Sequence, residues 1–177
     1  MQGTGGFLQP EEIVKQLNIR KDMQVADFGC GAGYFTITLA KLTEQGKIYA
    51  LDVMEQALES VRSRAKMQGL FNIETKRCNL EVARSSGLAD NSIDLALLAN
   101  ILFQSTKKVD IMKEARRILK KGGEIVIIDW LPNQPMGPPR DLIVSPEAVK
   151  KMAQDERLVF KKDFPVDAYH WGMIFTK

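Results

Sequence analysis

The chain has 177 residues, of which 45% are hydrophobic and 27% are charged, and its formal net charge is +3. This composition is typical of one globular domain and excludes disordered, collagen-like and coiled-coil chains. No apolar run approaches the ~20 residues that span a bilayer, and the small charge excess gives no argument for nucleic-acid binding.

Two cysteines without CxxC spacing and a single histidine argue against a metal site, and none is expected. The start of the chain lacks the basic and apolar regions of a signal peptide, so we expect a cytoplasmic protein. A single domain is expected over residues 1–177, with residues 1–9 as a flexible N-terminal segment. Phe7 and Leu8 could fold over a ligand or pack loosely at this end. The sequence gives no indication of the oligomeric state.

Short apolar and β-branched runs alternate with helical patterns along the chain. A helix is expected over residues 10–17, and strands are expected over 25–28, 47–51, 73–78, 93–99 and 124–129. Helical periodicity lies between the strands, over 35–42, 54–65 and 111–119, and the last of these helices should end at residues 120–123, where lysines precede glycines. This alternation predicts a parallel sheet with helices on both faces.

The C-terminal part has a different pattern. Four prolines in residues 130–139 predict an irregular loop, and Ser145 followed by Pro146 is a typical helix start. That helix should run to about Arg157, and two strands should follow, over 158–164 and 169–176. Residues 165–168 are too few for a parallel crossover, so this last pair must be antiparallel.

A glycine-rich loop follows the first strand. Asp27 precedes Gly29, Gly31 and Gly33, and Tyr34 comes next. Open α/β sheets bind ligands at the carboxyl ends of their strands, and glycine lets the backbone approach a ligand closely. A dinucleotide site requires a small residue where Tyr34 stands, and the acid favours a cationic ligand. A tight turn, with Asp27 capping backbone N–H groups, is the local alternative.

Two further polar residues follow the next strands. Asp52 closes the second strand, about 20 residues after the glycines, a distance at which a carboxylate can accept both ribose hydroxyls. Asn79 follows the third strand, and its amide can both donate and accept, as an adenine edge requires. The local alternatives are a helix cap for Asp52 and a turn for Asn79.

These motifs occur together in the order of a known family. The matching segments are residues 27–33, Asp52 and residues 78–80, 91–95 and 119–124. Over nearly its whole length, the chain resembles the class I S-adenosylmethionine (SAM)-dependent methyltransferases, with the closest likeness to small relatives of the ubiquinone/menaquinone-biosynthesis C-methyltransferase type. The resemblance implies a doubly wound, Rossmann-like α/β sheet of seven strands in the order 3-2-1-4-5-7-6. It also implies that the last strand is antiparallel.

The resemblance implies a role for each matched position. Asp27 and the backbone of residues 29–31 would hold the methionine part of SAM, Asp52 would bind the ribose and Asn79 the adenine. The complete set of expected cofactor-binding residues is Asp27, Gly29, Cys30, Gly31, Gly33, Tyr34, Asp52, Val53, Asn79, Leu80 and Asn100. The product would be S-adenosylhomocysteine (SAH).

No residue stands out as a catalytic base. Residues 100–104 occupy the segment after the fourth strand in which many relatives carry His-His or His-Glu. Asn100, Asp129 and His170 are weak candidates, because each is polar and expected near the mouth of the site. For His170, a packed or solvated position in a strand is the alternative.

The methyl acceptor is expected to be a small molecule. Tyr34, Phe103, Trp130 and Phe7 should line the mouth, which suits an apolar or aromatic compound. Methylation of RNA or protein remains open, as do a non-catalytic SAM-binding partner subunit and a nicotinamide-dependent oxidoreductase. The basic residues within 107–121 have no interleaved aromatics and are interpreted as a solvated helix face.

Overall fold

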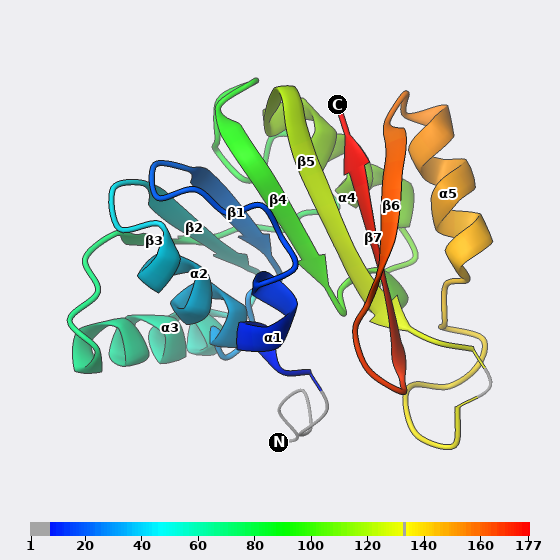
Figure 1. Ribbon diagram of the computed structural model, residues 1–177, viewed down its shortest axis with the longest axis horizontal. Helices are drawn as coiled ribbons and strands as arrows, with labels where there is room; N and C mark the ends of the chain where they lie inside the picture. Colours follow the sequence, from blue (N-terminus) through cyan, green and yellow to red (C-terminus); the bar gives the residue numbers. More distant parts are fainter. Residues whose placement is uncertain (1–7, 133) are drawn as a thin grey trace.

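The computed structural model describes residues 8–132 and 134–177, and in these residues seven strands form one sheet (Figure 1). The strands are β1 (Gln24–Phe28), β2 (Lys47–Asp52), β3 (Ile73–Arg77), β4 (Ile93–Ala99), β5 (Leu119–Trp130), β6 (Val159–Pro165) and β7 (His170–Thr176). Their order is β3-β2-β1-β4-β5-β7-β6. The first five are parallel, whereas β7 is antiparallel to both β5 and β6. The predicted order and the antiparallel last strand are confirmed.

Helices cover both faces of the sheet (Figure 1). They are α1 (Pro10–Val14), α2 (Tyr34–Leu42), α3 (Glu55–Met67), α4 (Lys108–Ile118) and α5 (Pro146–Asp155), with a 3₁₀ turn, η1 (Leu102–Gln104), after β4. Buried residues of α1 and α2 pack on one face, and buried residues of α4 and α5 pack on the other. None of the described helices is long and apolar enough to cross a membrane.

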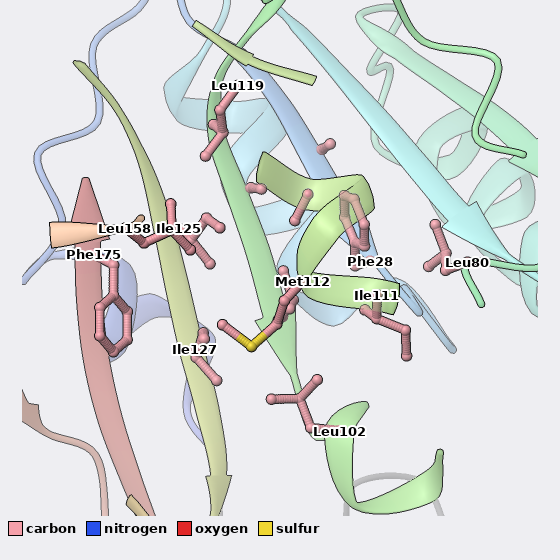
Figure 2. Close-up of a cluster of buried hydrophobic side chains, with 14 of the residues drawn as sticks. Phe28, Leu80, Leu102, Ile111, Met112, Leu119, Ile125, Ile127, Leu158 and Phe175 are labelled. Atoms are coloured by element: carbon pink, nitrogen blue, oxygen red, sulfur yellow. The ribbon is translucent and has the colours of Figure 1, made fainter. Parts of the chain in front are cut away.

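The central strands are buried on both faces because helices lie above and below them. In β4, Leu95, Ala96, Leu97 and Leu98 are each at most 1% exposed. Figure 2 shows the cluster on the α4 side, where Met112 of α4 lies with side chains of the sheet. This packed layer positions the strand ends at which the site is built.

The end of α4 differs from the prediction. The helix stops at Ile118, and Leu119 is already extended and pairs with Ile93 at the start of β5. Leu119 is fully buried in this position, and the Lys120 ammonium lies 2.8 Å from the Asp94 carboxylate. Burial of Leu119 and this ion pair favour the strand over another helical turn. The first helix is also shorter than expected, ending at Val14.

The C-terminal elements agree with the sequence pattern. The Ser145 hydroxyl accepts a hydrogen bond from the Ala148 N–H at 3.1 Å, which caps α5. In the connection between β6 and β7, Asp167 Oδ1 accepts the N–H groups of Tyr169 (2.7 Å) and His170 (2.8 Å). Because β7 pairs with β5, His170 lies opposite Trp130, beside the carboxyl end of β4.

Candidate cofactor-binding site

A cavity of about 550 Å³ opens at the carboxyl ends of β1 to β4. Its size is within the range of small-molecule sites. The residues expected from the sequence that line it are Asp27, Gly29, Cys30, Gly31, Tyr34, Asp52, Val53, Asn79, Leu80 and Asn100. The parallel register brings these positions together, since Phe28 pairs with Leu51 on one side and with Leu98 on the other.

Two glycines of the loop have different surroundings. Gly31 lines the cavity at φ +51°, and a Cβ there would meet no atom within 4 Å. Gly33 does not line the cavity. It has φ +82°, and a Cβ on it would lie 2.7 Å from Val61 Cγ2 of α3. Gly31 therefore faces ligand space, whereas Gly33 permits close packing between α2 and α3.

Asp52 holds the glycine loop and the start of α3 in place. Its Oδ2 accepts the Gly31 N–H and its Oδ1 accepts the Met54 N–H, both at 2.9 Å. Each carboxylate oxygen retains a further lone pair, so the side chain can still accept ligand hydroxyls. Val53 and Met54 beside it are 56% and 57% exposed and give the cavity rim an apolar surface.

Asp27 is a buried carboxyl group at the base of the cavity. It is 2% exposed, and its Oδ2 accepts the Thr36 hydroxyl at 2.5 Å. Burial raises the pKa of Asp27 to about 6, although the Thr36 hydrogen bond opposes the rise, and the charge of Asp52 adds to it. No cation pairs with Asp27 among the described residues. A ligand cation would therefore find a desolvated acid here.

The other predicted lining residues have smaller roles. Cys30 is 8% exposed, and burial raises its pKa, so it is a packed thiol. The Asn79 amide oxygen accepts the Glu81 N–H at 3.0 Å, which is the turn considered as the local alternative for this residue, and the amide hydrogens are left to donate. The Tyr34 hydroxyl lies 3.3 Å from the Arg64 guanidinium.

Part of the polar wall was missed by sequence reasoning. Glu81, Gln104 and Ser105 also line the cavity. The Ser105 hydroxyl donates to Glu81 Oε1 at 2.6 Å, and this bond joins the segments that follow β3 and β4. Their places just after strand ends were the available signal, but nothing in the residue types separated them from ordinary loop residues.

Of the three weak catalytic candidates, only Asn100 lines the main cavity. Asp129 is fully buried and accepts the N–H groups of Phe103 (3.2 Å) and Trp130 (2.8 Å). Burial raises the pKa of Asp129 to about 6, while these backbone bonds oppose the rise. His170 is 3% exposed and borders a separate cavity of about 470 Å³. It is a packed strand histidine.

The expected aromatic mouth is formed only in part. Tyr34 lines the cavity, but Phe103 and Trp130 do not. They contact each other edge to face, with ring centroids 6.5 Å apart, and the Trp130 ring packs against His170. Phe7 lies outside the described residues, while Leu8 does line the cavity.

The charges of the cavity have one sign. The acids Asp27, Asp52 and Glu81 line it, and no lysine, arginine or histidine of the described residues does. The described residues also contain no group of three or more His, Cys, Asp or Glu side chains that could hold a metal ion. SAM carries a sulfonium and an ammonium group, so the donor set fits this cofactor.

Comparisons with known proteins agree with this geometry. A family described as methyltransferase domain matches residues 19–163. The demethylmenaquinone methyltransferase of Geobacillus stearothermophilus is 28% identical over 120 residues, which cover 67% of this chain and 50% of that protein. The chain thus spans about half the length of the curated relatives it matches.

Solved structures give the same result over almost the whole chain. A SAM-dependent methyltransferase from Aquifex aeolicus has a TM-score of 0.86 at 26% identity, covering 96% of this chain and 89% of its own. A putative type 11 methyltransferase from Sulfolobus solfataricus has a TM-score of 0.78, also at 26% identity, covering 97% and 94%. The chain therefore belongs to the methyltransferase domain family, within the class I SAM-dependent methyltransferases, and SAM is its cofactor.

Proposed function

We propose that the protein transfers the methyl group of SAM to a small, neutral aromatic acceptor of the quinone class. The observation that carries the proposal is the cavity itself, which is lined by acids and apolar side chains and by no basic residue of the described chain. The matched relatives are named for methylating demethylmenaquinone, which supports a quinone-class acceptor here.

Each part of the cofactor is assigned to a different set of lining residues. Asp27 and the backbone at Gly29 and Gly31 would hold the methionine part, Asp52 would accept the ribose hydroxyls, and Asn79 would meet the adenine edge. Val53 and Leu80 would contact the adenine ring. When bound, SAM supplies an activated methyl group on a positively charged sulfur. The chain contributes by orienting the reactants and excluding water.

The lining charges make a nucleic-acid acceptor a poor fit. A phosphate backbone would meet the carboxylates of Asp27, Asp52 and Glu81 without a compensating cation from the described lining. The positive charge of α4 is also partly neutralised within the protein, since Arg117 pairs with Glu114 at 2.7 Å. No observation favours the partner-subunit or oxidoreductase alternatives.

Gly31→Ala is expected to lower the affinity for SAM on the order of tenfold, because its methyl group would enter the space that the cofactor needs. Gly87 is the matched control, since it has φ +64° and a Cβ there also meets no atom within 4 Å, but it lies outside the cavity. Alanine at either position should lower the free energy of unfolding by about 1 kcal/mol, because both glycines have a left-handed backbone conformation. Calorimetric titration of SAM should distinguish them, and equal affinities would contradict the assignment of Gly31.

The acceptor is tested by incubating the protein with methyl-labelled SAM and a reduced naphthoquinone that lacks the ring methyl group. Transfer of label, with a product heavier by one methyl group in mass spectrometry, is the expected result. Bulk RNA and a denatured protein mixture serve as competing acceptors. Labelling of either of these, with none of the quinol, would overturn the proposed acceptor class while leaving SAM as the cofactor.

A further inference from the structure

The sheet ends in two edge strands, β3 and β6 (Figure 1). An edge strand presents unpaired backbone groups to which a strand of another chain can add. β6 has three features that hinder such pairing: two adjacent lysines, a proline at its end and a shift of its register with β7 between Phe160 and Lys162. β3 has no proline, and its residues pair with β2 in an unbroken register. β3 is therefore the edge that is open to pairing.

The bonds between β3 and β2 determine which groups of β3 are free. The Asn72 carbonyl accepts the Ile48 N–H at 2.8 Å, and the Asp52 carbonyl accepts the Cys78 N–H at 2.9 Å. The backbone groups of successive strand residues point to alternate sides, so the even-numbered residues of β3 face β2. The odd-numbered residues direct their N–H and C=O groups to the free side, and they are Ile73, Thr75 and Arg77.

The sequence of β3 is complementary to itself in one antiparallel register. When Thr75 lies opposite Thr75 of a second copy, Ile73 of each copy lies opposite Arg77 of the other, and the free backbone groups of all three residues are paired. In the same register Glu74 of each copy lies opposite Lys76 of the other. A register centred on Glu74 or on Lys76 would place like charges opposite each other, which is destabilising.

The side chains around β3 are compatible with this register. Within one chain the Glu74 carboxylate lies 3.1 Å from the Lys76 ammonium, and a second copy would continue this row of alternating charges. On the other face of the strand, Arg62 donates to the Thr75 hydroxyl at 3.0 Å and pairs with Glu55 at 2.5 Å. The charge of Arg62 near the twofold axis is therefore balanced within its own chain.

The same register also provides a contact for an exposed aromatic side chain. Phe71 lies just before β3 and is 95% exposed in the single chain. Continued by two residues, the register brings Phe71 of one copy towards Asn79 of the other. Asn79 lines the cofactor cavity, so the second copy would border the site at the end of β3.

We propose that the protein forms a twofold dimer in which the β3 strands of two copies pair antiparallel about Thr75 and join the two sheets into one. The partner is a second copy of this chain because the free edge is complementary to itself in charge and in hydrogen-bonding pattern. The dimer needs neither SAM nor a methyl acceptor, so the proposed function and this inference can fail independently.

Sedimentation equilibrium tests the dimer and its register. Wild-type protein should dimerise, whereas Glu74→Lys or Lys76→Glu alone places like charges opposite at two symmetry-related positions and should weaken dimerisation about tenfold or more. The double variant, Glu74→Lys with Lys76→Glu, restores unlike pairs and should dimerise within about threefold of wild type. Asp163→Lys is the matched control, since it makes the same charge change on the other edge strand and also removes an ion pair, with Lys150. It should dimerise like wild type.

Wild-type protein that stays monomeric up to about 0.5 mM would overturn the proposal. Dimerisation that is weakened as much in the double variant, or in Asp163→Lys, as in the single variants would overturn it as well, because the effect would then not depend on the pairing of residues 74 and 76. If the single variants do not fold, Thr75→Pro takes their place. It removes an N–H that points away from β2, which an edge strand tolerates, and it should abolish the dimer.

Discussion

Asp52→Asn is expected to weaken SAM binding by at least about 100-fold. In the proposed complex the Asp52 carboxylate accepts both ribose hydroxyls, and the variant would lose these two charge-assisted hydrogen bonds, each worth about 1.5–3 kcal/mol. Asn also has one acceptor oxygen where Asp52 uses two, one for Gly31 and one for Met54. The glycine loop would therefore loosen as well. Calorimetric titration of SAM measures the loss directly.

Glu55→Gln is the matched control for this experiment. It removes the same charge from the start of α3, but Glu55 does not line the cavity and pairs with Arg62 on the surface. Its affinity for SAM should stay near that of wild type. Equal losses of SAM affinity in the two variants would mean that the overall negative charge at this edge of the sheet, rather than a ribose contact of Asp52, controls binding.

Asp27→Asn should make the free protein more stable and the complex weaker. Ionised Asp27 costs stability, because burial raises its pKa from 3.8 to about 6. Below pH 3.8 the group is protonated in both the folded and the unfolded chain, and its contribution to the free energy of unfolding is fully present. This contribution is lost as the pH rises through about 6, and it stays lost at higher pH. The pKa shift of Asp27 corresponds to about 3 kcal/mol. At pH 8 the free energy of unfolding of the variant should therefore exceed that of wild type by about 2 kcal/mol, which is part of this amount. Urea unfolding of the free protein at pH 8 measures this gain.

The same carboxyl group predicts how binding depends on pH. Wild-type affinity for cationic SAM should rise through pH 6 as Asp27 ionises, whereas Asp27→Asn should lack this rise and bind at least about tenfold more weakly at pH 8. Thr36→Val removes the hydrogen bond that opposes the pKa rise, so its midpoint should lie at a higher pH. An unchanged pH profile in Asp27→Asn would show that another group is responsible.

Local patterns predicted most of the framework. The strands, the glycine loop and Asp52 are each specified by residues close together in sequence, so periodicity and glycine spacing were sufficient to place them. The antiparallel hairpin followed from a connection of four residues. The strand order depended on the family resemblance, because the sequence of a strand does not indicate which distant strand it pairs with.

Contacts between distant residues could not be predicted in this way. Asn100 and His170 are 70 residues apart and meet only because β7 pairs with β5. Phe103 and Trp130 were expected at the cavity, but the Asp129 carboxylate binds both of their backbone N–H groups. Leu119 was expected in a helix, yet its burial beside β4 favours the strand.

The place of β7 has a consequence for synthesis on the ribosome. This strand is the last in sequence among the described elements but lies between β5 and β6 in the sheet. Until residues 170–176 have left the exit tunnel, β5 must present an unpaired, strongly apolar edge, and such edges promote association between chains. A nascent chain stalled before β7 would therefore be a substrate for chaperones.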